Sequence, residues 1–110
     1  MTLRVRVSSR AERDADTIFD WLAERSLDGA AHWYERYLAT LHSLPDRAEE
    51  CPTAPEADHL GLDLRQALFQ TLKGRVYRSL FIIRESIIHI VSVRGAGQDL
   101  VSADDLEIPE

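Results

Sequence analysis

With 45% hydrophobic and 29% charged residues, the 110-residue chain can bury one hydrophobic core and is too apolar to stay disordered, so we expect one domain over residues 1–110. The longest apolar runs are four residues, far short of the roughly 20 that span a membrane, and no signal-peptide hydrophobic region is evident. A single cysteine excludes an internal disulfide and suits a reducing compartment, so we expect a cytoplasmic protein.

The N-terminal part predicts a short strand followed by a helix. Residues 2–8 alternate apolar side chains with arginines, as in a strand with one buried face. Ser9 and Glu12 have the S-x-x-E spacing of a capping box, which predicts the start of a helix over residues 10–25. The buried stripe of this helix should include Ile18, Phe19 and Leu22.

A second helix is predicted over residues 29–44, closed by Pro45. Its apolar stripe should include Tyr34, Leu38 and Leu41. A short break between two amphipathic helices indicates an antiparallel helical hairpin, and because such helices are marginal alone, both should pack on a sheet. Residues 50–59, with two prolines, are expected to form a loop.

The stretch after this loop predicts three strands, at residues 62–70, 76–84 and 87–94, because β-branched and aromatic residues dominate it and short breakers divide it. The two-residue connection between the last two strands can join only antiparallel neighbours. We therefore expect an α+β fold with one antiparallel sheet. One apolar sheet face should meet the helical hairpin, and the other should carry Arg and Tyr side chains.

Charge is distributed unevenly along the chain. The sheet region, residues 64–94, has a formal net charge of +5, whereas residues 10–59 carry −7 and the whole chain −6. A basic region between acidic ones indicates a polarised molecule, which bears on its partners rather than on its fold.

Five segments together resemble the RelE/ParE superfamily of toxins from type II toxin–antitoxin systems, also described as the plasmid stabilisation protein family. They are residues 20–25 (DWLAER), 51–56 (CPTAPE), 64–69 (LRQALF), 77–81 (YRSLF) and 91–94 (VSVR). The resemblance covers roughly residues 3–99. Leu-Arg on one strand followed by Tyr-Arg on the next is its most specific feature.

The resemblance implies a growth-inhibiting toxin held inactive by a cognate antitoxin, whose C-terminal segment wraps the toxin. ParE-like members bind DNA gyrase, whereas RelE-like members cleave mRNA in the ribosome. The expected function is therefore either a ParE-like binding protein, or a RelE-like endoribonuclease, or a degenerate member without toxicity. No cofactor and no membrane partner are implied, and the oligomeric state is left open.

The resemblance makes Arg65, Arg78 and Arg94 the candidate catalytic residues of a nuclease. Arginine can stabilise the charge on a phosphorane, but it is a poor proton-transfer group because it stays protonated. The tyrosine that the nuclease type often has near its C-terminus is missing, since no tyrosine follows Tyr77. His89 is the natural substitute, although its place between two isoleucines favours a partly buried structural role. We therefore favour the binding protein over the nuclease.

Partner binding has its own candidates. Arg65, Arg78 and Arg94 are expected to converge near one end of the sheet, and with Arg75 they would attract an acidic antitoxin segment. Trp21 would add an aromatic anchor. The alternative for Trp21 is packing at the edge of the helix stripe.

A metal site at Cys51, Glu56 and His59 is a weaker possibility, because a surface loop with prolines and acids explains these residues better.

Overall fold

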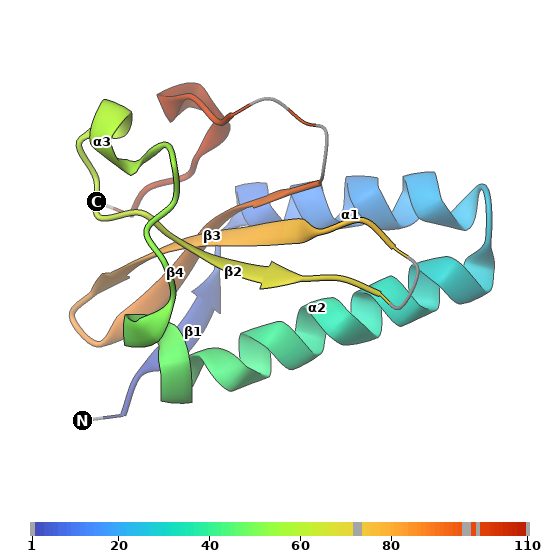
Figure 1. Cartoon of the computed structure of the whole chain (residues 1–110), viewed down its shortest axis with the longest axis horizontal. Coiled ribbons are helices and arrows are strands. Elements are labelled where there is room, and N and C mark those ends of the chain that lie inside the picture. The colour runs from blue at the N-terminus through green and yellow to red at the C-terminus, as the bar shows by residue number, and fades with distance from the viewer. Residues whose placement is uncertain (1, 72–73, 96–97, 99, 110) are drawn as a thin grey trace.

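The computed structural model describes residues 2–71, 74–95, 98 and 100–109. It is an α+β structure in which helices pack against a four-stranded sheet (Figure 1). In chain order the elements are β1 (Arg4–Val7), α1 (Ser9–Ala23), α2 (Leu27–Arg47), η1 (Ala48–Glu50), α3 (Ala57–Leu60), β2 (Arg65–Phe69), β3 (Tyr77–Arg84), β4 (Ile87–Arg94) and η2 (Ala103–Asp105).

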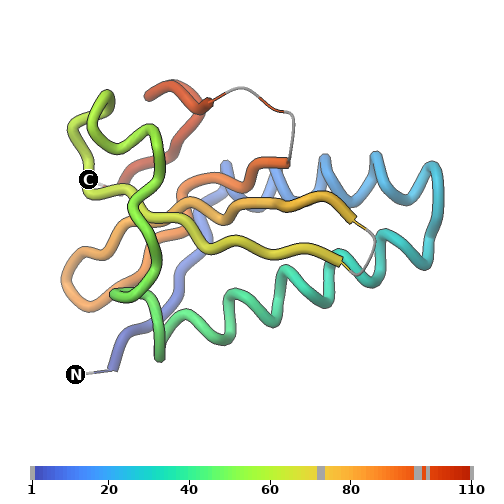
Figure 2. The backbone as a smooth tube through the Cα atoms, viewed as in Figure 1, coloured from blue at the N-terminus to red at the C-terminus, as the bar shows by residue number. Residues whose placement is uncertain are grey.

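The sheet is mixed, so the expectation of a wholly antiparallel sheet is wrong. Its strand order is β1-β4-β3-β2, in which β2, β3 and β4 pair antiparallel and β1 joins β4 in parallel. Parallel neighbours need a long connection between them, because the chain must return to the end of the sheet at which the first strand began. The elements between β1 and β4 provide that connection. Figure 2 shows the N-terminal strand beside β4, with the two helices lying along one side of the sheet.

The turn between β3 and β4 contains the two residues Glu85 and Ser86, both with positive φ, at 51° and 65°. Positive φ at both central residues is the requirement of a type I′ hairpin, whose twist matches that of the strands. The predicted two-residue connection is therefore present, with residues that lack the conformational freedom of glycine.

Both predicted helices are present, with ends displaced by one to three residues. The N-cap of α1 is Ser8 rather than Ser9, and its Oγ accepts a hydrogen bond from the N–H of Ala11 at 3.0 Å. Pro45 does not end α2 but lies inside its last turn, since the helix continues to Arg47.

The buried face of α2 is rotated from the predicted one. Trp33 is fully buried and stacks on Tyr37, with ring centroids 5.5 Å apart. Tyr34 and Leu38, expected in the core, are 41% and 37% exposed, whereas Leu41 is buried as predicted. The larger indole lies against Phe69 and Tyr77 in the helix-side core. The predicted core residues of α1, at positions 18, 19 and 22, are only partly buried.

The sheet is covered on both faces, so the expected polar face of Arg and Tyr is wrong. On the face away from α1 and α2, Leu80, Ile82 and Val91 are buried. The loop containing α3 and the C-terminal segment cover this second face, where they lie together in Figure 1. The covering side chains come from both segments: Ala54, Ala57, Leu60, Leu62, Leu64, Val101, Leu106 and Ile108.

A β-bulge helps to produce this two-faced core. The pairing of β3 and β4 shifts between Leu80 and Phe81, so that Leu80 pairs with Ser92 and Phe81 with Ile90. Val91 therefore packs on the second face with Ile82, the cross-strand partner of His89, whereas the bulge turns Val93 to the helix side.

Candidate functional site

The three candidate arginines of the sheet do not converge. Arg78 and Arg94 are direct cross-strand neighbours on β3 and β4. Arg65 aligns instead with Phe81, whose side chain lies in the helix-side core, and residues that face each other across strands point to the same side. The guanidinium of Arg65 donates to the carbonyl of Glu49 at 2.6 Å. The predicted cluster is thus reduced to the pair Arg78 and Arg94.

Arg78 is committed to an internal ion pair. Its two terminal nitrogens donate to both carboxylate oxygens of Glu56, at 2.8 and 2.7 Å, and one of them also donates to the side chain of Gln66. Glu56 is 3% exposed, and it accepts a further bond from the N–H of Val101 at 3.0 Å. These bonds, chiefly that from Arg78, lower the pKa of Glu56 to about 2. The guanidinium of Arg78 is therefore already bound to a carboxylate. In a nuclease it would have to be available to bind a phosphate group.

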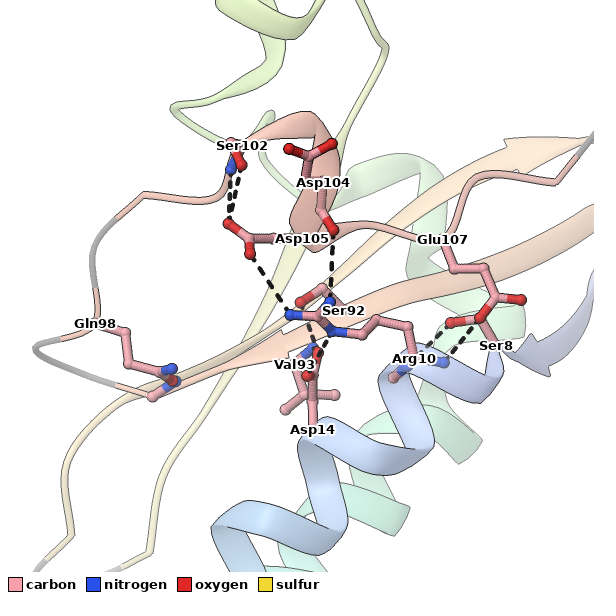
Figure 3. Close-up of polar contacts among 12 residues, drawn as sticks. Ser8, Arg10, Asp14, Ser92, Val93, Gln98, Ser102, Asp104, Asp105 and Glu107 are labelled. Carbon is pink, nitrogen blue, oxygen red and sulfur yellow. Dashed lines mark hydrogen bonds and ion pairs between the residues drawn. The ribbon is translucent and has the colours of Figure 1, made fainter.

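A polar network ties the C-terminal segment to the start of α1 (Figure 3). The Arg10 side chain pairs with Asp14 at 3.1 Å and with Asp105 at 3.5 Å, and the backbone N–H of Arg10 donates to the carboxylate of Glu107 at 2.9 Å. Asp105 also caps η2 by accepting from the N–H of Ser102, and the pKa of its carboxyl is lowered mainly by that bond, with a contribution from Arg94. Arg94 therefore lies in the field of an acidic segment.

The same network covers part of the edge of β4. Strand β1 pairs with β4 only as far as the bond from the N–H of Ser8 to the carbonyl of Ile90. Beyond that point Oδ2 of Asp14 accepts from Ser92 Oγ at 2.8 Å and from the N–H of Val93 at 3.0 Å. A helix carboxylate thus replaces the missing strand (Figure 3).

Two partner-binding candidates do come together. Trp21 of α1 and Arg75, just before β3, line one pocket of about 260 Å³. The other lining residues are Thr17, Ile18, Tyr77, Gly95 and Gln98. Trp21 is 50% exposed, so the structure places it on the surface rather than at the edge of the core.

Aromatic rings line the pocket, and one arginine lines it while another stacks on Trp21. Tyr77 stacks on Phe69 and meets Trp33 edge-on, and burial raises the pKa of its hydroxyl. The guanidinium of Arg25 lies over the Trp21 ring, 3.5 Å from its centroid. Apolar walls with cations beside them suit an apolar side chain with a neighbouring carboxylate. We refer to this site as the Trp21–Arg75 pocket.

His89 lies in a different place, a pocket of about 250 Å³ that it shares with Arg6, Ser8, Ser9 and residues of the C-terminal segment. Burial, together with the charges of Arg6 and Arg84, lowers the pKa of His89. It aligns with Ile82, toward the opposite end of β4 from Arg94. It is therefore separated from Arg78 and Arg94 and does not supply a proton-transfer group to them.

Cys51 is buried and its pKa is raised by burial. Within residues 2–71, 74–95, 98 and 100–109, no cluster of three or more His, Cys, Asp or Glu side chains could hold a metal ion.

The contacts that Glu56, Asp14 and Tyr77 make in the structure were not predicted from the sequence. Glu56 stood in a segment resembling a surface loop, and the acids of α1 looked like solvated helix surface. The available signal was the nearly continuous apolar run in residues 80–83 and 88–91, which indicates a sheet buried on both faces. A second covering layer would have directed attention to the loop at residues 50–62.

Neither a scan against models of protein families nor a search of curated proteins gives a match to this chain. Among the described residues, no helix has the length and apolar character needed to cross a membrane. What the fold and the site define is an α+β protein with a mixed sheet covered on both faces and an exposed aromatic pocket beside arginines.

Proposed function

We propose that this protein is the toxin of a type II toxin–antitoxin system and acts in the cytoplasm by binding a target protein. Its element order, a strand, two helices and three antiparallel strands, supports a RelE/ParE-like fold. DNA gyrase is the target that the ParE-like resemblance favours. A cognate antitoxin neutralises the protein by covering the surface that the target needs.

The observation that carries the proposal is the Trp21–Arg75 pocket. An exposed tryptophan between a stacked arginine and a second arginine has the composition of an interface centre. Its occupant is a segment in which apolar side chains alternate with carboxylates. An antitoxin segment of that kind would exclude the target by competition.

The nuclease alternative is weakened by the ion pair between Arg78 and Glu56. To bind a scissile phosphate, Arg78 would have to leave a buried carboxylate that it neutralises, and breaking such a pair costs about 3–5 kcal/mol. His89 lies too far along β4 to replace the missing tyrosine.

Growth inhibition by the induced protein tests the proposal, with the product of the adjacent gene as the candidate antitoxin. We expect Trp21→Ala combined with Arg75→Ala to abolish both growth inhibition and antitoxin binding. Arg13→Ala is the matched control, because Arg13 is an exposed arginine of α1 outside the pocket. Full toxicity and full antitoxin binding in the double variant would refute the role of the pocket.

A second assay separates the two classes of toxin. Purified protein should inhibit gyrase supercoiling and should leave mRNA intact on translating ribosomes. Cleavage by the parent protein that is lost in Arg78→Lys would replace our proposal by the nuclease alternative.

A further inference from the structure

A second apolar surface lies between the two long helices, on the face of α1 turned toward α2. It is a groove of about 230 Å³ with Ala15, Tyr37 and Leu41 among its lining residues, all three buried. Tyr34 and Leu38, one helical turn apart on α2, line it and are each more than a third exposed. We call this the inter-helix groove.

The exposed ring of Tyr34 is held in place. The Tyr34 ring packs edge-on against the ring of Phe19 in α1, with ring centroids 6.0 Å apart. Its centroid also lies 6.0 Å from that of the Tyr37 ring. The groove wall is therefore built by both helices and is already ordered. A preformed apolar wall costs little conformational entropy when a partner covers it.

The α1 side of the groove is acidic. Glu12 and Asp16 line it, both are exposed, and within the described part of the chain neither forms an ion pair. The cation nearest to them in sequence, Arg13, is not among the lining residues. Burial is the largest cause of the raised pKa of the Tyr37 hydroxyl, and the charges of Glu12 and Asp16 raise this pKa further. The buried residues of the groove therefore lie in a negative potential.

We propose that the inter-helix groove is the docking site for a basic amphipathic helix of a partner protein. Its apolar stripe would cover Tyr34 and Leu38, and lysines or arginines beside that stripe would meet Glu12 and Asp16. A third helix laid between two packed helices buries the apolar wall in the usual helix-in-groove manner. The opposite sign of charge distinguishes this partner helix from the acidic segment assigned to the Trp21–Arg75 pocket.

A second copy of this chain fits the groove less well. Two such grooves placed face to face would bring Glu12 and Asp16 of both copies together, and like charges at an interface are unfavourable. Charge complementarity therefore selects a basic partner.

The test uses a labelled helical peptide as the probe, with leucines at one-turn spacing and lysines elsewhere, of about 16 residues to match the roughly 22 Å length of α1. Two control peptides have the same composition in scrambled order, or glutamate at every lysine position. Fluorescence anisotropy at two salt concentrations measures binding to the full chain. We expect the basic amphipathic peptide alone to bind, and more weakly at high salt.

Variants of the protein then locate the bound peptide. Tyr34→Ser and Leu38→Ser should each weaken binding about tenfold or more, since each removes apolar contact area. Glu12→Gln with Asp16→Asn should lower the salt dependence. Leu68→Ser and Glu49→Gln are matched controls at exposed positions outside the groove, and they should bind normally.

Three results would overturn the proposal. They are equal binding of either control peptide, unchanged binding by Tyr34→Ser and Leu38→Ser, or a concentration-dependent dimer in sedimentation that Leu38→Ser abolishes. The last result would assign the groove to a second copy. Because neither Trp21 nor Arg75 is altered and growth is not measured, these outcomes are independent of the proposed toxin function.

Discussion

Both oxygens of the Glu56 carboxylate are bonded to Arg78, in a position that is almost closed to water. Glu56→Gln would leave the guanidinium without a countercharge beneath the covering loop, so we expect a loss of about 3 kcal/mol in the free energy of unfolding. Urea denaturation at pH 7 measures it. Glu49→Gln, at an exposed acid, should change stability by less than about 0.5 kcal/mol. Equal effects of the two substitutions would contradict the importance of the ion pair.

The same carboxylate makes stability depend on pH. Its pKa is about 2 in the folded protein, against an ordinary value of 4.5, so the unfolded chain binds the proton more readily. This contribution is complete above pH 4.5 and is lost as the pH falls toward 2, at about 1.4 kcal/mol per pKa unit, or about 3 kcal/mol in all. Urea midpoints between pH 7 and pH 3 should fall less steeply in Glu56→Gln than in the parent. Parallel curves would show that Glu56 does not titrate in this way.

At the scale of single elements, α1 protects the part of β4 that β1 does not reach. Asp14→Ala would remove the acceptor of the Val93 N–H and of Ser92 Oγ. Because an unsatisfied buried donor costs about 1–3 kcal/mol, we expect that loss of stability together with faster hydrogen exchange at the Val93 amide. Asp16→Ala, two residues further along α1 and exposed, should leave exchange at Val93 unchanged.

The rotation of α2 gives a direct comparison of two leucines on one helix. Leu44 is fully buried, so Leu44→Ala should cost about 2–5 kcal/mol. Leu38 is partly exposed, so Leu38→Ala should cost less than about 1 kcal/mol, in contrast to what its place in the sequence pattern predicts. Chemical denaturation of both variants checks the orientation of the helix, and a reversed order would contradict it.

The elements could be predicted from sequence because each has a strong local signal. The alternation in residues 2–8, the helical periodicity and the β-branched runs identified every long helix and strand. The rotation of α2 could not, because Trp33 and Tyr34 are adjacent aromatic residues and only packing decides which one is buried. The parallel pairing of β1 with β4 could not be predicted either. Hydrophobic periodicity shows which face of a strand is buried, but not whether the neighbouring strand runs parallel or antiparallel.

Individual residues of the candidate site could be predicted from the sequence, but which of them meet in space could not. Trp21 and Arg75 were both expected to bind a partner, yet their meeting beside Tyr77 depends on how the fold places α1 relative to the start of β3. The expectation that Arg65 joins the other two arginines was wrong because successive side chains of a strand point to opposite faces. Arg65 is paired with Phe81 and therefore points to the same face as Phe81. The partner of Arg78 lies 22 residues earlier in an irregular loop, beyond any spacing rule.

At the scale of the whole molecule, the C-terminal segment is a structural layer. Val101, Leu106 and Ile108 pack on the face of the sheet that carries Leu80 and Ile82. Ending the chain at Leu100 would expose that face, and since each large apolar side chain contributes about 1.5–3 kcal/mol, the loss should exceed about 3 kcal/mol. Urea denaturation and binding of a hydrophobic dye measure the effect. An unchanged midpoint without added dye fluorescence would show that the segment is not needed.

The parallel pairing of β1 with β4 also sets the order in which the molecule can be assembled. Arg4 lies opposite Ile87, so the first strand to leave the ribosome has to wait for the last strand of the sheet. Contacts this distant in sequence form slowly, and until then Leu3, Val5 and Val7 stay uncovered. The Trp21–Arg75 pocket, which joins α1 to residues beyond β4, is likewise absent from every nascent chain that has not completed that strand. The pocket thus forms only after β4 and the residues that follow it have been synthesised, late in the folding of this domain.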